Sequence, residues 1–182
     1  VQALFSFDKT HVHLDNSTLL VATGRNEFAL ALTEKNGVIT SGAGFDATTL
    51  QCRSLQTDGV DIGIITCAQI SRLTSQHEDG YLFVGGTDGL AVLRKSDGKG
   101  FESLKDLTTL APYTFKKILK SDGASFTDVR ALAADDTNVY VLTFKNLYKI
   151  AYASHDTWRD IGASVLGEES IATPLQLMAR DG

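Results

Sequence analysis

Several features that mark particular classes of protein are scarce or missing in this sequence. Proline occurs only twice in 182 residues, and no apolar run approaches the ~18 residues that a membrane-spanning helix needs. Basic residues are outnumbered, 17 against 22 acidic ones, which excludes the basic excess on which nucleic-acid binding normally depends. The apolar fraction of 43% is that of an ordinary folded domain, so global disorder is excluded as well.

Cysteine is also scarce, with only Cys52 and Cys67 present. No C-x-x-C pair occurs, which excludes the usual zinc and dithiol spacings. Two readings stay open: one disulfide formed in an oxidising compartment, or two buried thiols that act as small hydrophobic side chains. The compartment therefore stays unknown. Because the chain starts at Val1 and not at Met, we expect a processed product or a piece of a longer protein.

Glycine, in contrast, is abundant, and many of the 16 glycines follow an aspartate or asparagine. Asp-Gly and Asn-Gly pairs between apolar runs are the strongest short-range signal for a β-hairpin turn. They occur at Asn36-Gly37, Asp58-Gly59, Asp79-Gly80, Asp88-Gly89, Asp97-Gly98, Asp122-Gly123 and Asp181-Gly182. The apolar runs between them are short and rich in β-formers, which predicts strands. The predicted strands are residues 18–23, 28–33, 62–66, 81–85, 90–94, 129–133, 138–143 and 147–152.

One segment, residues 103–120, has some helical character. Leu104, Leu107 and Leu110 recur every three residues, but Pro112 interrupts the pattern and would break a helix there. The segment is therefore expected to be an insertion loop with at most one helical turn.

Three stretches of the chain align with one another, starting at Asp15, Asp79 and Asp136. Each has an acidic turn, an apolar strand, a short polar turn and a second apolar strand; the first strands contain Val21, Val84 and Val141. A repeat of roughly 45 residues with two to four strands is typical of a β-propeller blade, and longer spacings fit the same unit with insertions.

The fold that we expect is all-β, a β-propeller segment of about three four-stranded blades plus a partial blade. The blades would span roughly residues 1–50, 51–110 and 111–165, with the partial blade at 166–182 and the insertion loop at 103–120. Small sheets that are apolar on both faces must stack to be stable, and an open ring leaves strand edges unpaired. We therefore expect either further blades of the same protein or a homo-oligomer that completes the ring.

A turn motif follows the second strand pair. Ser96, Asp97, Gly98, Gly100 and Phe101 fill an Asp-box pattern, and a shortened version consists of Ser154, Asp156 and Trp158. On these residues the chain resembles, in degenerate form, the Asp-box or regulator-type β-propeller repeats of sialidase-like, sortilin-like and assembly-factor proteins. In those repeats the box is a structural turn, so the resemblance implies a fold and not an activity.

Signals for chemistry are weak. His11 and His13 would share a strand face, but two imidazoles alone do not make a metal site, and a half-exposed strand face explains them. Residues 85–89 lack the lysine and helix of a phosphate-binding loop, and no G-x-S-x-G motif is present. No motif brings together the arginines and tyrosine of a sialidase-like site. We expect no catalytic residues, no metal and no cofactor.

The most informative feature for function is the set of equivalent hairpin turns. Equivalent turns of stacked blades lie on one face, and their charges differ here, which a partner-binding surface can have and a purely structural turn need not. For any one of these turns, an ordinary polar turn is the alternative. These turns are Arg25-Asn26, Thr87-Asp88 and Lys145-Asn146. A second candidate contact is the insertion loop, with Tyr113 and Phe115 expected to be exposed.

The sequence thus favours a non-catalytic binding or scaffold propeller that engages another protein through its face loops. Two alternatives stay open. One is a glycan-binding or glycan-processing, sialidase-like propeller, and the other is an extracytoplasmic sensor module of a larger signalling protein. The cluster Lys116, Lys117 and Lys120 is interpreted as a solvated loop and not as a nucleic-acid patch, because the chain is acidic overall.

Overall fold

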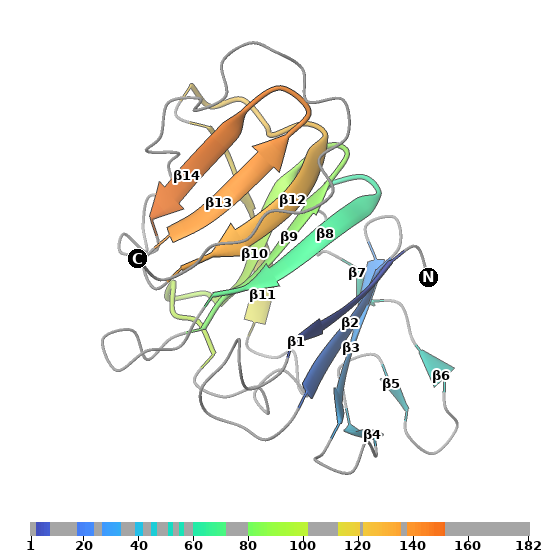
Figure 1. Ribbon diagram of the computed structural model, residues 1–182. Coiled ribbons are helices and arrows are strands. Elements are labelled where there is room, and N and C mark those ends of the chain that lie inside the picture. The colour runs from blue at the N-terminus through green and yellow to red at the C-terminus, as the bar shows by residue number, and fades with distance from the viewer. Residues whose placement is uncertain are drawn as a thin grey trace.

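The computed structural model describes part of the chain with side chains and part as backbone only. Side chains are described for residues 60–71, 80–101, 114–120, 122–135 and 138–151. The backbone alone is described for residue 113 and for the strands before residue 60. All of the described elements are strands, and no helix occurs among them (Figure 1). In these residues, accordingly, there is no apolar helix of membrane-spanning length.

Three antiparallel sheets follow one another along the chain, and the side chains of the second and third are described. The sheets are numbered in chain order. The second sheet has the strand order β11-β10-β9-β8 and the third has the order β12-β13-β14, so each is a simple up-and-down meander. The second sheet consists of β8 (Ile65–Ile70), β9 (Leu82–Gly86), β10 (Leu90–Lys95) and β11 (Tyr113–Ile118). The third consists of β12 (Val129–Ala134), β13 (Asn138–Thr143) and β14 (Leu147–Ala151).

The first sheet is an antiparallel meander as well, in the order β1-β2-β3-β4, with β7 added on β3. Its strands are β1 (Ala3–Phe7), β2 (Thr18–Thr23), β3 (Glu27–Thr33), β4 (Ile39–Ser41) and β7 (Leu55–Gln56). A separate two-stranded ribbon pairs β5 (Phe45–Asp46) with β6 (Gln51–Cys52).

Among the described side chains, the core lies between the second and third sheets. Val129 of β12 sits against Gly85 of β9, where a side chain on the glycine would come within 2.5 Å of the valine Cγ1 and 2.8 Å of the Cys67 sulfur. The cluster continues with Tyr81, Phe83, Leu90, Val92, Ile118, Phe126, Leu132, Ala134, Val139, Val141 and Ile150. Burying each large side chain of this kind contributes about 1.5–3 kcal/mol, so the contact between the sheets is a main source of stability.

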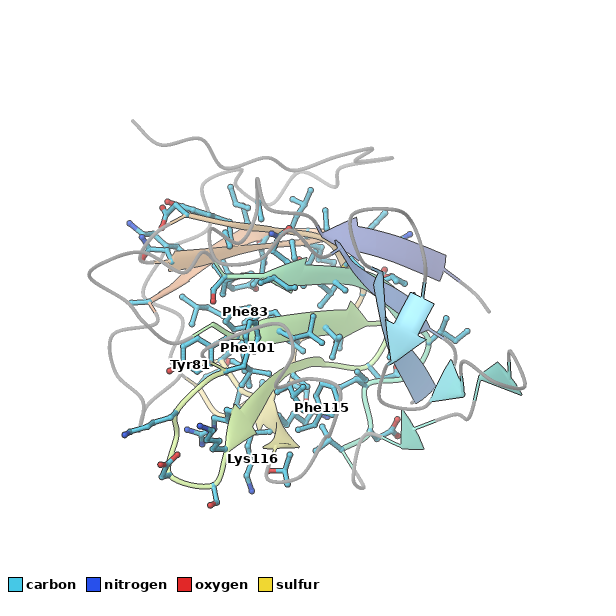
Figure 2. All side chains as sticks on the ribbon, turned by 90° about the horizontal axis from the view of Figure 1, so that it is seen from below. Tyr81, Phe83, Phe101, Phe115 and Lys116 are labelled. Atoms are coloured by element: carbon cyan, nitrogen blue, oxygen red, sulfur yellow. The ribbon has the colours of Figure 1, made fainter. Side chains whose placement is uncertain are left out.

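The two inner strands of the second sheet, β9 and β10, are buried on both faces. All five residues of β9 and the first four of β10 are buried, so alternate side chains on either face are covered. Figure 2 shows Tyr81, Phe83 and Phe101 grouped together inside the molecule, while Lys116 of the outer strand points outward. This is the environment expected of a sheet that is stacked between neighbours.

The second sheet corrects the predicted insertion loop at 103–120. Residues 113–118 form β11, which pairs with β10 along its whole length, so this part of the predicted loop is a strand and the second sheet extends to Ile118. Lysine has a weak preference for the β-strand conformation, but pairing with the apolar strand β10 outweighs it. Lys116 lies opposite Val92, and Ile118 lies opposite Leu90.

Candidate functional site

Two of the predicted hairpin turns are described, and both are tight. In the β9–β10 hairpin the Gly86 amide donates to the Gly89 carbonyl at 2.9 Å, so Thr87 and Asp88 are the central residues. In the β13–β14 hairpin the Thr143 amide donates to the Asn146 carbonyl at 2.9 Å. The central residues there are Phe144 and Lys145, one position earlier than the predicted Lys145-Asn146.

The first sheet has a hairpin of the same register. Thr23 of β2 pairs with Phe28 of β3, just as Gly85 pairs with Leu90 and Leu142 with Leu147. All three hairpins therefore join partners that are five positions apart. The central residues predicted for the first one, Arg25 and Asn26, lie outside the described residues.

Asp128 connects the two described turns through its backbone. Its amide donates to the Thr87 carbonyl at 2.8 Å, and its carbonyl accepts a 3.2 Å hydrogen bond from the Phe144 amide. Asp128 has a φ of 56°, in the left-handed region, which aspartate tolerates better than most residues. The two turns consequently lie side by side at one end of the paired sheets.

The side chain of Asp128 contributes a second link. Its carboxylate forms an ion pair with Arg130 Nη2 at 2.9 Å, and the guanidinium lies 5.7 Å from the centre of the Phe144 ring. Both charged side chains are close to half exposed, so the ion pair itself contributes at most about 1 kcal/mol. The backbone hydrogen bonds, and not the ion pair, hold the turns together.

The Thr87-Asp88 turn is also held by the segment before β8. The Ile64 amide donates to Thr87 Oγ1 at 3.1 Å, and the Thr87 amide donates back to the Ile64 carbonyl at 3.0 Å. The Asp88 amide donates to the Ile62 carbonyl at 3.0 Å. The backbone of this turn is thus fixed on both sides, while the Asp88 side chain stays exposed.

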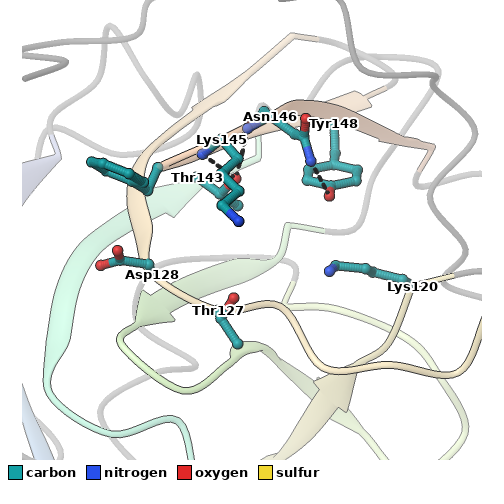
Figure 3. A pocket seen from close by; sticks show the side chains of 8 residues that line it. Lys120, Thr127, Asp128, Thr143, Lys145, Asn146 and Tyr148 are labelled. Atoms are coloured by element: carbon teal, nitrogen blue, oxygen red, sulfur yellow. Dashed lines mark hydrogen bonds between the residues drawn. The ribbon is translucent and has the colours of Figure 1, made fainter. Parts of the chain in front are cut away.

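A pocket of about 280 Å³ opens beside the second turn. Its lining comes from the segment before β12 and from the β13–β14 hairpin: Lys120, Thr127, Asp128, Thr143, Phe144, Lys145, Asn146 and Tyr148. In Figure 3 the ammonium groups of Lys120 and Lys145 and the hydroxyl of Thr127 point into the same space. The lining is therefore a mixture of polar and aromatic groups, with two cations directed toward the interior of the pocket.

Aromatic rings hold Lys120 in place. Its Nζ lies 5.8 Å from the centre of the Phe126 ring and 5.7 Å from that of Tyr148, which are cation–π distances. The two rings meet edge to face at 5.1 Å, and Asn146 Nδ2 donates to the Tyr148 hydroxyl at 3.0 Å. Phe126 itself is fully buried, so Tyr148 of the pocket lining packs against a core side chain.

Some of the predicted partner-binding residues are exposed in the structure, and others are not. Thr87, Asp88, Lys145 and Asn146 are exposed or half-exposed and are brought to one face. Phe115, expected to be exposed, is only 2% exposed, because β11 places it opposite Leu93 inside the sheet; this expectation was wrong. For Tyr113 only the backbone is described, as the first residue of β11.

Sequence reasoning missed three residues that matter to this face. No sequence pattern pointed to Asp128, because its link between the two turns depends on its left-handed backbone conformation. Lys120 was noticed only as part of a basic cluster. Tyr148 looked like any aromatic residue of a predicted strand, and only the fold brings it to Lys120.

Of the two cysteines, Cys67 is described and is a free, buried thiol. Burial raises its pKa to about 12, against smaller opposing effects of hydrogen bonds with Thr66 and with the Gly85 carbonyl. Cys67 thus acts as a small core side chain, as one of the two predicted readings had it. The side chain of Cys52 lies outside the described residues.

The first predicted Asp-box segment forms a tight turn after β10. The Lys99 amide donates to Asp97 Oδ1 at 3.0 Å, and the Lys95 amide donates to the Lys99 carbonyl at 2.7 Å. Phe101 closes the turn as a fully buried side chain that pairs with Gly80. The second segment, with Ser154, Asp156 and Trp158, lies outside the described residues.

No group of three metal-binding side chains is found in the described part of the chain. The histidines considered for a metal, His11 and His13, lie outside it. Residues 85–89 form the end of β9 and a hairpin turn, not a phosphate-binding loop. The chain as a whole matches no protein-family model, no curated protein and no solved structure.

Proposed function

We propose that the three sheets are successive blades of a β-propeller segment and that the face with the hairpin turns binds another protein. Three antiparallel meanders with equivalent hairpins are what successive blades require. The first strands of the sheets also follow one another in space, since β8 contacts both β1 and β12 (Figure 1). In a propeller such first strands surround the central channel.

One observation supports the binding role above all others, the pair of backbone hydrogen bonds through Asp128. They fix the turns 86–89 and 143–146 on one face, while the side chains of Asp88 and Lys145 stay exposed. Exposed loops on a rigid scaffold are the usual place for recognition. Opposite charges at equivalent positions would let the face discriminate between partners.

Site-specific photo-cross-linking tests this function. A photoreactive residue is introduced at Asp88 or at Lys145, and the protein is irradiated in the cells that naturally make it. The matched control is Asp97, which is also exposed but follows the opposite end of β10. We expect both face positions to capture the same protein, identified by mass spectrometry, and the control position not to capture it.

Capture from Asp97 as efficient as from Asp88 would contradict a partner on the hairpin face. So would the absence of a common adduct from positions 88 and 145. Each variant is first checked by urea unfolding, so that a loss of capture is not a loss of folding.

A further inference from the structure

The pocket beside the second hairpin turn, the Lys120 pocket, has the chemistry of an anion site. Lys120 and Lys145 come from different elements, yet both ammonium groups point into it (Figure 3). The Thr127 hydroxyl joins them, and the Tyr148 hydroxyl lies on the wall. Two cations with nearby hydroxyl donors form charge-assisted hydrogen bonds to a carboxylate or a similar anion.

Within the described residues, neither ammonium group forms an ion pair. The one carboxylate of the lining, Asp128, is paired with Arg130 at 2.9 Å. Figure 3 shows Asp128 at the margin of the pocket, with its carboxylate directed away from the two lysines. The positive charge of the pocket is therefore not neutralised by its own lining.

Two aromatic rings restrain the position of Lys120 before any ligand arrives. Its Nζ lies over the rings of both Phe126 and Tyr148, and those rings are locked edge to face. A lysine held in this way loses less side-chain entropy on binding than a free surface lysine does.

The groups left free in the pocket favour an acidic side chain over a sugar. A volume of about 280 Å³ has room for one acidic side chain. The face of the Tyr148 ring, on which a sugar could stack, is already occupied by Lys120. The groups that remain, the ammonium groups of Lys120 and Lys145 and the hydroxyl of Thr127, can donate hydrogen bonds to a compact anion.

We propose that the Lys120 pocket binds the carboxylate of an aspartate or glutamate side chain of the partner protein. This inference rests on the proposed function in one respect, that the partner is a protein. The acidic side chain would serve as an anchor on the face that Thr87, Asp88 and Lys145 border.

The test is a titration of the full chain, followed by amide signals of Thr127, Phe144 and Asn146 in ¹H–¹⁵N spectra. The probe is acetyl-Gly-Glu-Gly-amide, and acetyl-Gly-Gln-Gly-amide is the neutral control. We expect saturable shifts with the glutamate peptide only, at millimolar affinity, weakened by salt as an exposed charge contact should be.

Variants separate charge from packing. Lys120→Met keeps an unbranched side chain over the two rings and removes the charge, and Lys145→Met does the same at the other cation. Each should weaken binding of the glutamate peptide about fivefold or more. Lys120→Arg, which retains the charge, should stay within about threefold of the parent chain. Lys99→Met, at an exposed lysine beyond the other end of β10, should have no effect.

Three results would overturn the assignment. Equal binding of the glutamine and glutamate peptides would show that charge is not recognised. Tighter binding of 3′-sialyllactose than of the glutamate peptide would assign the pocket to an acidic sugar. Failure of both peptides while cross-linking at Asp88 persists would remove the pocket and leave the binding face intact.

Discussion

The backbone amide of Asp128 donates a 2.8 Å hydrogen bond to the carbonyl of Thr87, across the boundary between the third and second sheets. Thr87 is the first central residue of one hairpin turn, and Asp128 accepts from Phe144 of the other turn. A single residue with left-handed backbone geometry thus links two separate hairpins that share one face.

Substitutions of Asp128 test this link. Asn adopts the left-handed region readily, and the lost ion pair is exposed, so Asp128→Asn should lower the free energy of unfolding by about 1 kcal/mol or less. Asp128→Val should cost about 2 kcal/mol, because a β-branched residue is strained at a φ of 56°. Urea unfolding measures both. Equal stability of the two variants would show that residue 128 is not left-handed.

A second pair of variants tests the close contact between the β9–β10 turn and the segment before β8. A Cβ at Gly86 would lie 2.1 Å from the Ile62 carbonyl oxygen, a clash with backbone that only a shift of the turn can relieve. Gly86→Ala should therefore lower the free energy of unfolding by about 3 kcal/mol.

Gly123→Ala is the matched control. Gly123 has a φ of +81° but nothing within 4 Å of its would-be Cβ, so only the backbone strain of about 1 kcal/mol is expected. If Gly86→Ala is no more destabilising than Gly123→Ala in urea, the turn does not lie against Ile62.

The thiol of Cys67 makes stability depend on pH in the alkaline range. Burial raises its pKa from an ordinary value of 9.0 to about 12, so the folded chain keeps the thiol neutral where the unfolded chain ionises it. The contribution to stability is complete below pH 9 and is lost as the pH rises toward 12. The slope in that window reaches at most about 1.4 kcal/mol per pH unit.

Urea unfolding of the parent chain and of Cys67→Ala, between pH 8 and pH 10.5, isolates this contribution. The variant is less stable at pH 8 because a cavity replaces the sulfur, but its stability should fall less steeply with pH. Parallel curves for the two chains would contradict a buried thiol at this position.

Tyr140 has a pKa above its ordinary value, chiefly because its hydroxyl donates a 2.7 Å hydrogen bond to Asp135, with burial and the aspartate charge adding to the effect. Asp135→Asn should lower this pKa, as followed by ¹³C NMR of labelled tyrosine. The stability due to the hydrogen bond is complete below the pKa of the unfolded chain and is lost as the pH rises through that of the folded chain. An unchanged titration would disprove the contact.

Much of the strand pattern could be predicted from the sequence, because local signals and tertiary packing agree there. The runs at 18–23 and 138–143 coincide with β2 and β13. The run at 62–66 was placed too early, since β8 begins at Ile65. Gly63, with a φ of +71°, and the buried Ile62 belong to the segment that supports the Thr87-Asp88 turn.

The candidate site was only partly predictable. Alternation and turn chemistry indicated Thr87 and Asp88, because hairpin signals are local. They could not reveal that residue 128 would be left-handed, or that Lys120 would meet Tyr148, because both facts depend on how separate segments pack. Phe115 was misjudged for the same reason: the neighbouring strand, and not the local sequence, buries it.

The measurement that tests the packing of the sheets most directly is the nuclear Overhauser effect between the γ-methyl groups of Val129 and the α-protons of Gly85. These groups belong to different sheets, and a Cβ on Gly85 would come within 2.5 Å of Val129 Cγ1. A strong cross-peak is expected if the third sheet packs on the second as described. Its absence, with both resonances assigned, would contradict the shared face and the proposals that depend on it.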